Sequence, residues 1–136
     1  MAKQATAAVV REPGGPYALE TVELDDLRPD EVYVRIEATG VCHTDANMQV
    51  MVPMPAVVGH EGVGIVEEVG SAVDYVKPGD RVILSWPACG VCPTCLTGHR
   101  YVCDNAFQLL FGGKRLDGSP TIKLGGEWIS GAWFQQ

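Results

Sequence analysis

The chain has 136 residues, 46% of them hydrophobic and 20% charged, which is the size and balance of one folded globular domain. Its formal charge of −7 argues against a nucleic-acid partner, because proteins that bind nucleic acid present a basic face. No apolar run reaches the ~20 residues that a membrane span needs, and residues 1–6 lack the apolar centre of a secretory signal, so we expect a cytoplasmic protein.

Short strands separated by turns are predicted along most of the chain. Between residues 32 and 39, apolar and polar side chains alternate with the period of two that a half-buried strand requires. Further strands are expected at residues 6–10, 18–24, 62–69 and 81–86. Because 16 glycines and nine prolines favour turns between these segments, the pattern predicts a mostly β fold, either a small barrel or a sandwich.

Helices are expected to be few and short, at residues 44–48 and 97–101. From residue 107 onward the strand pattern weakens, and the glycine pair at 125–126 favours a loop-rich tail. No dinucleotide-binding unit is predicted. The Gly62-Val63-Gly64 stretch lacks the third glycine of that fingerprint, and it lies in a predicted strand rather than at the start of a helix.

The five cysteines carry the strongest functional signal. An odd number of cysteines without a secretory signal does not suit a disulfide framework. Cys89, Cys92, Cys95 and Cys103 follow the pattern C-x2-C-x2-C-x7-C, in which a tight loop can direct four thiolates toward one Zn²⁺. A zinc ion with four cysteine ligands has no open coordination position, so such a site is structural.

Two alternatives remain open for this cluster. A bacterial ferredoxin also begins C-x2-C-x2-C, but its fourth cysteine follows after three residues and precedes proline. Here the last gap is seven residues, and Asp104 follows. Disulfide bonds are the other alternative, which the missing secretory signal disfavours. The spacing therefore favours a structural zinc loop over residues 89–103.

A second group of metal-ligating residues lies outside the cluster. Cys42 directly follows the best predicted strand, and His60 lies 18 residues further on. A lone cysteine is commonly a small buried hydrophobe, so these two residues leave the choice between core and metal ligand open. With Asp45 and Glu61 they supply the thiolate, imidazole and carboxylates of an open metal site. Asp45 could bind the second ring nitrogen of His60, as carboxylates do beside metal-bound histidines.

Four motifs in this order resemble the zinc-containing alcohol dehydrogenases of the medium-chain dehydrogenase/reductase superfamily. They are GVCHTD from residue 40, GHE from residue 59, KPGDRV from residue 77 and the four-cysteine loop, and the resemblance covers residues 6–110. It implies that residues 1–136 form the GroES-like β-barrel that is the zinc-binding catalytic domain of such enzymes. It also implies oxidation of an alcohol to an aldehyde or ketone, with NAD⁺ or NADP⁺ as hydride acceptor.

The resemblance further implies roles for individual residues. Cys42 and His60 would hold a catalytic zinc, with Glu61 able to enter its coordination sphere. Asp45 would support His60. Thr44 would accept the proton of the alcohol, and His43 would lie toward the pyrophosphate of the cofactor. The structural zinc would bind Cys89, Cys92, Cys95 and Cys103.

Two departures from the family pattern matter. The third catalytic-zinc ligand of the family, a cysteine, and its Rossmann domain have no counterpart in these residues. We therefore expect a truncated fragment that binds structural zinc but is inactive alone. Asn47 stands where many members have a histidine that completes a proton relay. Because an amide does not titrate near neutral pH, a relay from Thr44 must run through cofactor hydroxyls and water.

Residues 109–118 resemble the branch of the family that acts on aryl or benzyl alcohols. Trp86 is expected in the substrate pocket, since relatives place a bulky residue there. Trp128, Trp133 and Phe134 could extend an apolar wall.

The expected partners are a small alcohol or aldehyde and, for the whole protein, copies of itself. The fragment is expected to self-associate through apolar residues at 50–55, which would be left open. The alternative function is a stand-alone zinc-stabilised GroES-like structural or binding module. A small iron–sulfur electron carrier is the third candidate.

Overall fold

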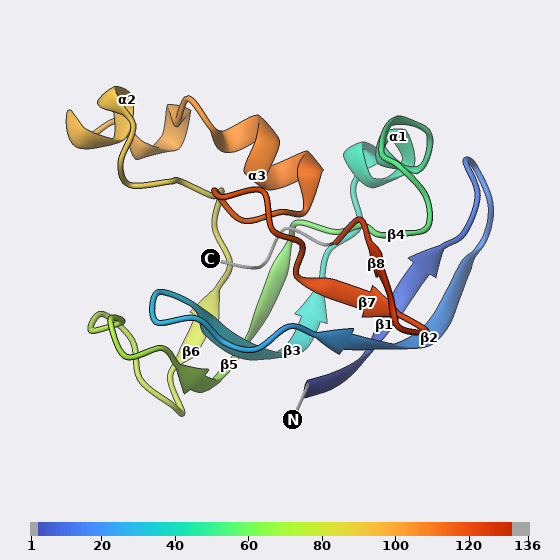
Figure 1. Ribbon diagram of the computed structural model, residues 1–136, viewed down its shortest axis with the longest axis horizontal. Helices are drawn as coiled ribbons and strands as arrows, with labels where there is room; N and C mark the ends of the chain where they lie inside the picture. Colours follow the sequence, from blue (N-terminus) through green and yellow to red (C-terminus); the bar gives the residue numbers. More distant parts are fainter. Residues whose placement is uncertain (1–2, 132–136) are drawn as a thin grey trace.

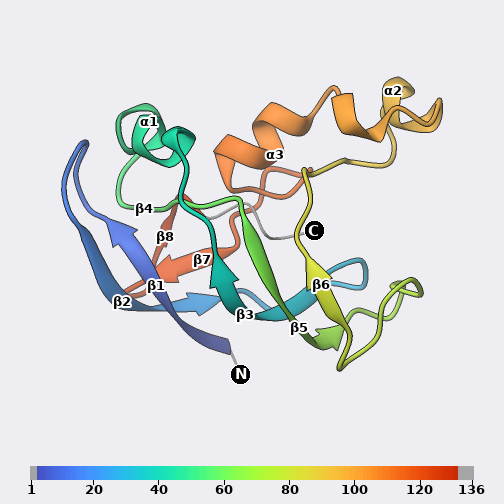
Figure 2. The ribbon, with the colours of Figure 1, turned by 180° about the vertical axis from the view of Figure 1, so that it is seen from behind.

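The computed structural model describes residues 3–131, and within that range the chain forms short strands connected by turns and short helices. The strands are β1 (Lys3–Val10), β2 (Tyr17–Leu24), β3 (Val32–Thr39), β4 (Ala56–Val57), β5 (Gly62–Val69), β6 (Arg81–Ile83), β7 (Ile122–Leu124) and β8 (Glu127–Ile129). The helices are α1 (His43–Met51), α2 (Pro93–Leu96), the 3₁₀ helix η1 (Arg100–Val102) and α3 (Ala106–Gly112). They lie on one side of the strands, with α1 and α2 at opposite ends (Figure 1, Figure 2).

The five-stranded sheet, in the order β4-β1-β2-β7-β8, closes on itself. The edge strand β4 and the chain just after β8 form a bridge between Ala56 and Ser130. The N–H of Val57 donates to the Ser130 carbonyl at 3.0 Å, and the N–H of Ser130 donates to the Pro55 carbonyl at 3.3 Å. Since closure removes the free edges of a sheet, the barrel, rather than the sandwich, is the observed form of the predicted mostly β fold.

Branched apolar side chains fill the inside of this closed sheet. Val9, Val22, Val57, Ile122 and Ile129 are each at most 8% exposed and pack as one cluster. Burying such a side chain contributes about 1.5–3 kcal/mol, and branched residues suit strands because they lose little rotamer freedom there. The barrel wall is therefore held by the residues that also favour its extended backbone.

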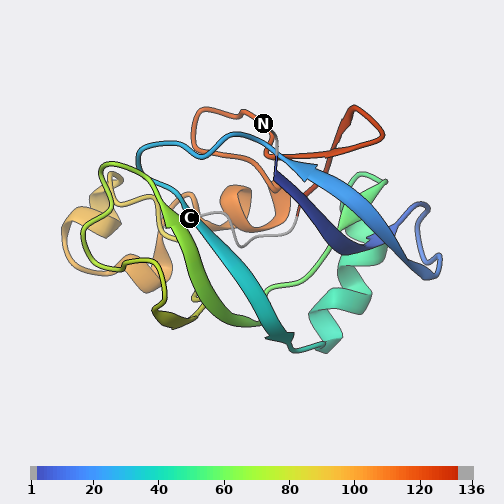
Figure 3. The same cartoon turned by 90° about the horizontal axis from the view of Figure 1, so that it is seen from below.

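The second sheet, in the order β3-β5-β6, brings the segments of the candidate site together. β3 and β5 are antiparallel, and their register runs from Val32 opposite Val69 to Thr39 opposite Gly62. The residues that follow β3 therefore lie beside the residues that precede β5. Seen from below, β3 runs toward α1 and β5 runs back beside it in the opposite direction (Figure 3).

The tail differs from the prediction, because α3, β7 and β8 replace the expected loops. Leu109 and Leu110, 4% and 1% exposed, bury one face of α3. Leu110 packs with Met48 of α1, which supplies the contact that a short helix needs for stability. β7 and β8 form a hairpin whose turn uses the positive φ of Gly125 and Gly126.

The last predicted strand and the second predicted helix differ from the structure. β6 ends at Ile83 rather than at residue 86; after the Ile83–Val63 pair, the Leu84 N–H still donates to the carbonyl of Gly62, the first residue of β5, at 2.9 Å. The helix expected at residues 97–101 is wrong: Gly98, with φ +88°, interrupts it, and α2 and η1 lie on either side. In the described range, no helix combines the length and apolar character needed to cross a membrane.

Candidate metal centres and active site

The four cysteines of the predicted zinc loop converge. The sulfurs of Cys89, Cys92, Cys95 and Cys103 all lie within 4.8 Å of one another. Cys89 and Cys95 sulfurs are 4.0 Å apart, and Cys92 and Cys103 sulfurs 3.9 Å. A tetrahedral zinc with sulfurs at about 2.3 Å sets them about 3.8 Å apart, so the cluster fits a four-thiolate zinc site. Disulfide bonds are excluded, since they need sulfurs about 2.05 Å apart and all five cysteines are free.

Hydrogen-bond donors surround these sulfurs. The backbone N–H of Cys92 donates to the Cys89 sulfur at 3.3 Å, and that of Cys95 to the Cys92 sulfur at 3.4 Å. The Asn105 side-chain amide donates to the Cys89 sulfur at 3.3 Å, and this bond is the main reason that the pKa of Cys89 is lowered to about 6. Burial raises the pKa of Cys95 to about 12, a cost that a bound cation would offset by stabilising the thiolate. Asn105 was not among the predicted site residues.

The second group begins at the first turn of α1. Cys42 is the N-cap of this helix, and its sulfur accepts the backbone N–H of Thr44 at 3.3 Å. The backbone N–H of Cys42 donates to Oδ2 of Asp45 at 2.8 Å. These reciprocal bonds form a capping box, which fixes Cys42 and Asp45 relative to each other.

His60 lies between these two residues. Its Nδ1 is 3.0 Å from Oδ1 of Asp45, and its Nε2 is 3.1 Å from the sulfur of Cys42. Asp45 is 4% exposed, so a proton on Nδ1 is directed to a carboxylate that is shielded from water. That tautomer leaves the Nε2 lone pair on the side of Cys42.

The donor set of this second group fits a zinc ion. The ligand atoms of Cys42, Asp45 and His60 lie within 4.8 Å of one another. In a tetrahedral site, sulfur and imidazole nitrogen ligands are about 3.6 Å apart, so Cys42 and His60 need only a small separation to hold the ion. Thiolate and neutral imidazole are the donors that zinc prefers.

The remaining predicted residues of this group lie around it. Oε1 of Glu61 is 3.7 Å from Nε2 of His60, and the Glu61 side chain is 48% exposed. His43 is the first residue of α1 and is exposed, and Thr44 is half-buried. Asn47 is exposed on the same helix. The structure therefore brings together the residues predicted from the GVCHTD and GHE motifs.

Trp86 lies elsewhere. Its side chain is 52% exposed and lines a groove of about 570 Å³ together with Tyr75 and Tyr101. Neither Cys42 nor His60 lines this groove, so a role for Trp86 in a substrate pocket stays a prediction. Of the tail aromatics, Trp128 packs against the Lys123 ammonium at 4.3 Å, whereas Trp133 and Phe134 lie outside the described residues.

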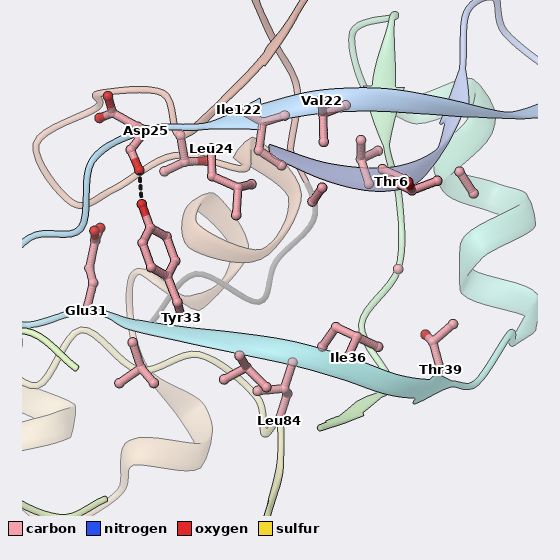
Figure 4. Close-up of a pocket in the computed structure, with 18 of the residues that line it drawn as sticks. Thr6, Val22, Leu24, Asp25, Glu31, Tyr33, Ile36, Thr39, Leu84 and Ile122 are labelled. Atoms are coloured by element: carbon pink, nitrogen blue, oxygen red, sulfur yellow. Dashed lines mark hydrogen bonds between the residues drawn. The ribbon is translucent and has the colours of Figure 1, made fainter. Parts of the chain in front are cut away.

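A cavity of about 300 Å³ separates the two sheets (Figure 4). Val22 and Leu24 of β2 line one side, and Ile36 of β3 and Leu84 line the other. At one end the Tyr33 hydroxyl donates to the backbone carbonyl of Asp25, and burial raises the pKa of Tyr33. The lining is mostly apolar, and the metal-ligating atoms described above are not part of it.

A family model described as the alcohol dehydrogenase GroES-like domain matches residues 28–132. Geraniol dehydrogenase of Castellaniella defragrans is 45% identical over 135 residues, which are 97% of this chain and 36% of that protein. Alcohol dehydrogenase B of Mycobacterium tuberculosis is 42% identical over 125 residues, 88% of this chain and 33% of that protein. The chain thus spans about a third of the length of these relatives.

Solved structures agree with these matches. The crystal structure of an alcohol dehydrogenase zinc-binding domain protein from Burkholderia ambifaria is similar over 98% of this chain and 37% of its own, with TM-score 0.91 and 42% identity. Benzyl alcohol dehydrogenase of Acinetobacter calcoaceticus is similar over 88% of this chain and 34% of its own, with TM-score 0.82 and 38% identity. The likeness to the Burkholderia ambifaria structure therefore extends over nearly the whole chain.

Proposed function

The chain belongs to the alcohol dehydrogenase GroES-like domain family, and from this membership we propose that it supplies the zinc-binding part of the active site of a zinc-dependent alcohol dehydrogenase. The proposed reaction of the whole protein converts an alcohol and NAD⁺ or NADP⁺ to an aldehyde or ketone and NADH or NADPH. The observation that carries the proposal is the position of His60 between the Cys42 sulfur and the buried Asp45 carboxylate.

In this proposal Cys42 and His60 are the catalytic metal ligands. A zinc ion held there would polarise the substrate oxygen and lower the pKa of the alcohol. Asp45 keeps the His60 ring in one tautomer and orientation through the 3.0 Å contact with Nδ1. The capping box on α1 holds Asp45 in place, so helix formation and ligand placement depend on the same residues.

Thr44 is the proposed proton acceptor for the substrate hydroxyl. Its backbone N–H is tied to the Cys42 sulfur, which keeps residue 44 beside the metal ligands. Asn47 is exposed, and its amide cannot titrate near neutral pH, so Asn47 would not relay the proton; cofactor hydroxyls and water would have to carry it away from Thr44. His43 is the proposed contact for the cofactor pyrophosphate; its position as first residue of α1 supports this role, since helix N-termini favour anions.

We assign the four-cysteine cluster a structural role. Four thiolates leave a zinc ion no open position for a substrate, and the loop over residues 89–103 buries few apolar side chains of its own. Metal binding there would offset the chain entropy of ordering this loop.

An apolar primary alcohol is the proposed substrate class. The geraniol and benzyl alcohol dehydrogenases, among the similar proteins, are named for bulky apolar alcohols. Trp86 is the proposed residue of the substrate pocket. In this proposal the groove that Trp86 lines opens toward His60.

Residues 1–136 alone are expected to bind zinc without oxidising alcohols, since no nucleotide-binding unit lies among the described residues. For the whole protein we propose a homo-oligomer. The chain alone should self-associate through an apolar surface that includes Val50 and Met51, which are 65% and 63% exposed.

The test measures alcohol-dependent reduction of NAD⁺ and NADP⁺ by the whole protein that carries these residues. Cys42→Ser and His60→Gln should abolish the reaction with benzyl alcohol or geraniol, because each removes a ligand. His99→Gln is the matched control, since His99 is exposed and contributes to neither ligand group. A wild-type protein that reduces neither cofactor, or full activity in both ligand variants, would contradict the proposal and favour the structural module.

A further inference from the structure

Gly40 and Glu61 face each other one step beyond the last paired residues of β3 and β5. The N–H of Gly40 donates to the backbone carbonyl of Glu61 at 2.7 Å, next to the Thr39–Gly62 pair. This bond places the Glu61 side chain directly over residue 40. Glu61 is therefore attached to the sheet through its backbone while its carboxylate remains on the side of the metal ligands.

The Glu61 carboxylate occupies the space that a side chain at residue 40 would take. A Cβ atom built on Gly40 would lie 2.1 Å from Oε2 of Glu61, 3.0 Å from its Cβ and 3.1 Å from its Cδ. Real atoms keep about 3.5 Å between them, so any Cβ at residue 40 would force this carboxylate to move by at least about 1 Å. Since Oε1 of Glu61 is 3.7 Å from Nε2 of His60, that movement would change its position relative to His60.

Alanine at this position would displace the end of the Glu61 side chain rather than strain the backbone. Gly40 is not among the residues with positive φ, so its backbone is one that alanine can adopt. Replacing Gly40 by alanine therefore tests the contact with Glu61 with little added backbone strain.

We propose that Gly40 is a positioning residue: by lacking a side chain, it lets the Glu61 carboxylate lie beside Nε2 of His60. The carboxylate then provides an oxygen 3.7 Å from the imidazole Nε2 of His60. The consequence for metal binding rests on the proposed function, whereas the placement of Glu61 does not. Outer groups of this kind change metal affinity by about 10–100-fold when they are removed.

The first experiment measures Co²⁺ binding to the whole protein with its four-cysteine site already filled with zinc. Gly40→Ala and Glu61→Ala should each weaken binding at the Cys42–His60 group by about 10–100-fold and shift the visible absorption of Co²⁺, which reports its donor set. The double variant should be no weaker than Glu61→Ala. Gly62→Ala is the matched control, because its Cβ would meet Leu84 at 2.9 Å and Ile36 at 3.4 Å instead of Glu61.

A second readout needs no metal at the Cys42–His60 group. The ¹⁵N chemical shift of His60 Nε2, assigned by its loss in His60→Gln, should change in Gly40→Ala as it does in Glu61→Ala. It should stay at the wild-type value in Gly62→Ala. Retained zinc at the four-cysteine site shows that each variant is folded.

The two readouts separate the proposals. If wild type binds Co²⁺ at this group and Gly40→Ala behaves like wild type in both readouts, the role of Gly40 is wrong and the zinc proposal stands. If wild type binds no Co²⁺ there, the zinc proposal fails, and the ¹⁵N shift alone decides whether Gly40 positions Glu61. A Gly40→Ala effect that persists unchanged on top of Glu61→Ala would also overturn the proposal, because Gly40 would then act through the backbone.

Discussion

One carboxylate, that of Asp45, joins both predicted ligands of the catalytic metal. Its Oδ1 lies 3.0 Å from Nδ1 of His60, and its Oδ2 accepts the backbone N–H of Cys42 at 2.8 Å. Because Asp45 is also buried, its position depends on the protein rather than on solvent. The orientation of the imidazole is thereby linked to the first turn of α1.

This link predicts the effect of Asp45→Asn. The amide can still accept the Cys42 N–H, but it presents no negative charge to Nδ1 of His60. Zinc affinity at the Cys42–His60 group should fall by about 10–100-fold, measured by competition with a chelator. Asn47→Ala, an exposed change on the same helix, should leave the affinity unchanged. Equal affinities for Asp45→Asn and wild type would show that Asp45 only caps the helix.

The four-cysteine site should release zinc at a pH that depends on Asn105. The amide of Asn105 stabilises the Cys89 thiolate and is the main cause of its lowered pKa of about 6. Asn105→Ala raises that pKa, so protons compete better with zinc and the midpoint of acid-induced release moves to higher pH. A zinc-sensitive dye during acid titration measures this midpoint, with Asn47→Ala as the matched control. A midpoint that stays or moves to lower pH would contradict the assignment.

Arg115 should contribute more to stability than a surface ion pair. Its side chain is 9% exposed and binds the carboxylates of Asp25, at 2.7 Å, and of Glu31. These ion pairs join the loop after α3 to the loop before β3. Arg115→Ala leaves these carboxylates without their partner, which should lower the free energy of unfolding by about 3 kcal/mol. The reference variant is Arg11→Ala, which breaks an exposed pair with Glu20 and should change stability little. Urea denaturation gives both values, and equal losses would show that the Arg115 pairs are no stronger than surface pairs.

The packing of α3 on α1 can be tested with Leu110→Ala. Leu110 is 1% exposed and contacts Met48, so its truncation should cost about 2–5 kcal/mol of unfolding free energy. Leu19→Ala, at a side chain that is 80% exposed, provides the control. If both variants unfold at the same urea concentration, α3 does not pack as described.

Much of the fold was predictable where periodicity is strong. The alternation over residues 32–39 matches β3, and the strand expected at residues 62–69 matches β5. The strand pattern alone left barrel and sandwich open, because closure depends on backbone bonds of Ser130 to residues 55 and 57 that carry no side-chain signal. The family resemblance was what predicted the barrel. α3 was missed because it is short and is stabilised by the distant Met48 rather than by its own pattern.

The ligand groups of the candidate site were predictable from the motifs, whereas the residues that support those ligands were not. The cysteine spacing predicted the four-sulfur cluster, and the joint presence of thiolate, imidazole and carboxylate indicated the group at Cys42, which the structure brings together. Asn105 was missed because an amide becomes a thiolate donor only through the fold of the loop. The space at Gly40 was equally invisible, since it exists only once β3 and β5 are paired.

Zinc content per chain tests the central claim most directly. After dialysis against free Zn²⁺, the whole wild-type protein that carries these residues should hold about two zinc ions per chain, one in each ligand group. Cys42→Ser should hold about one, at the four-cysteine cluster, and His99→Gln should match wild type. A wild-type protein with one zinc that Cys42→Ser leaves unchanged would show that Cys42 and His60 do not form a metal site.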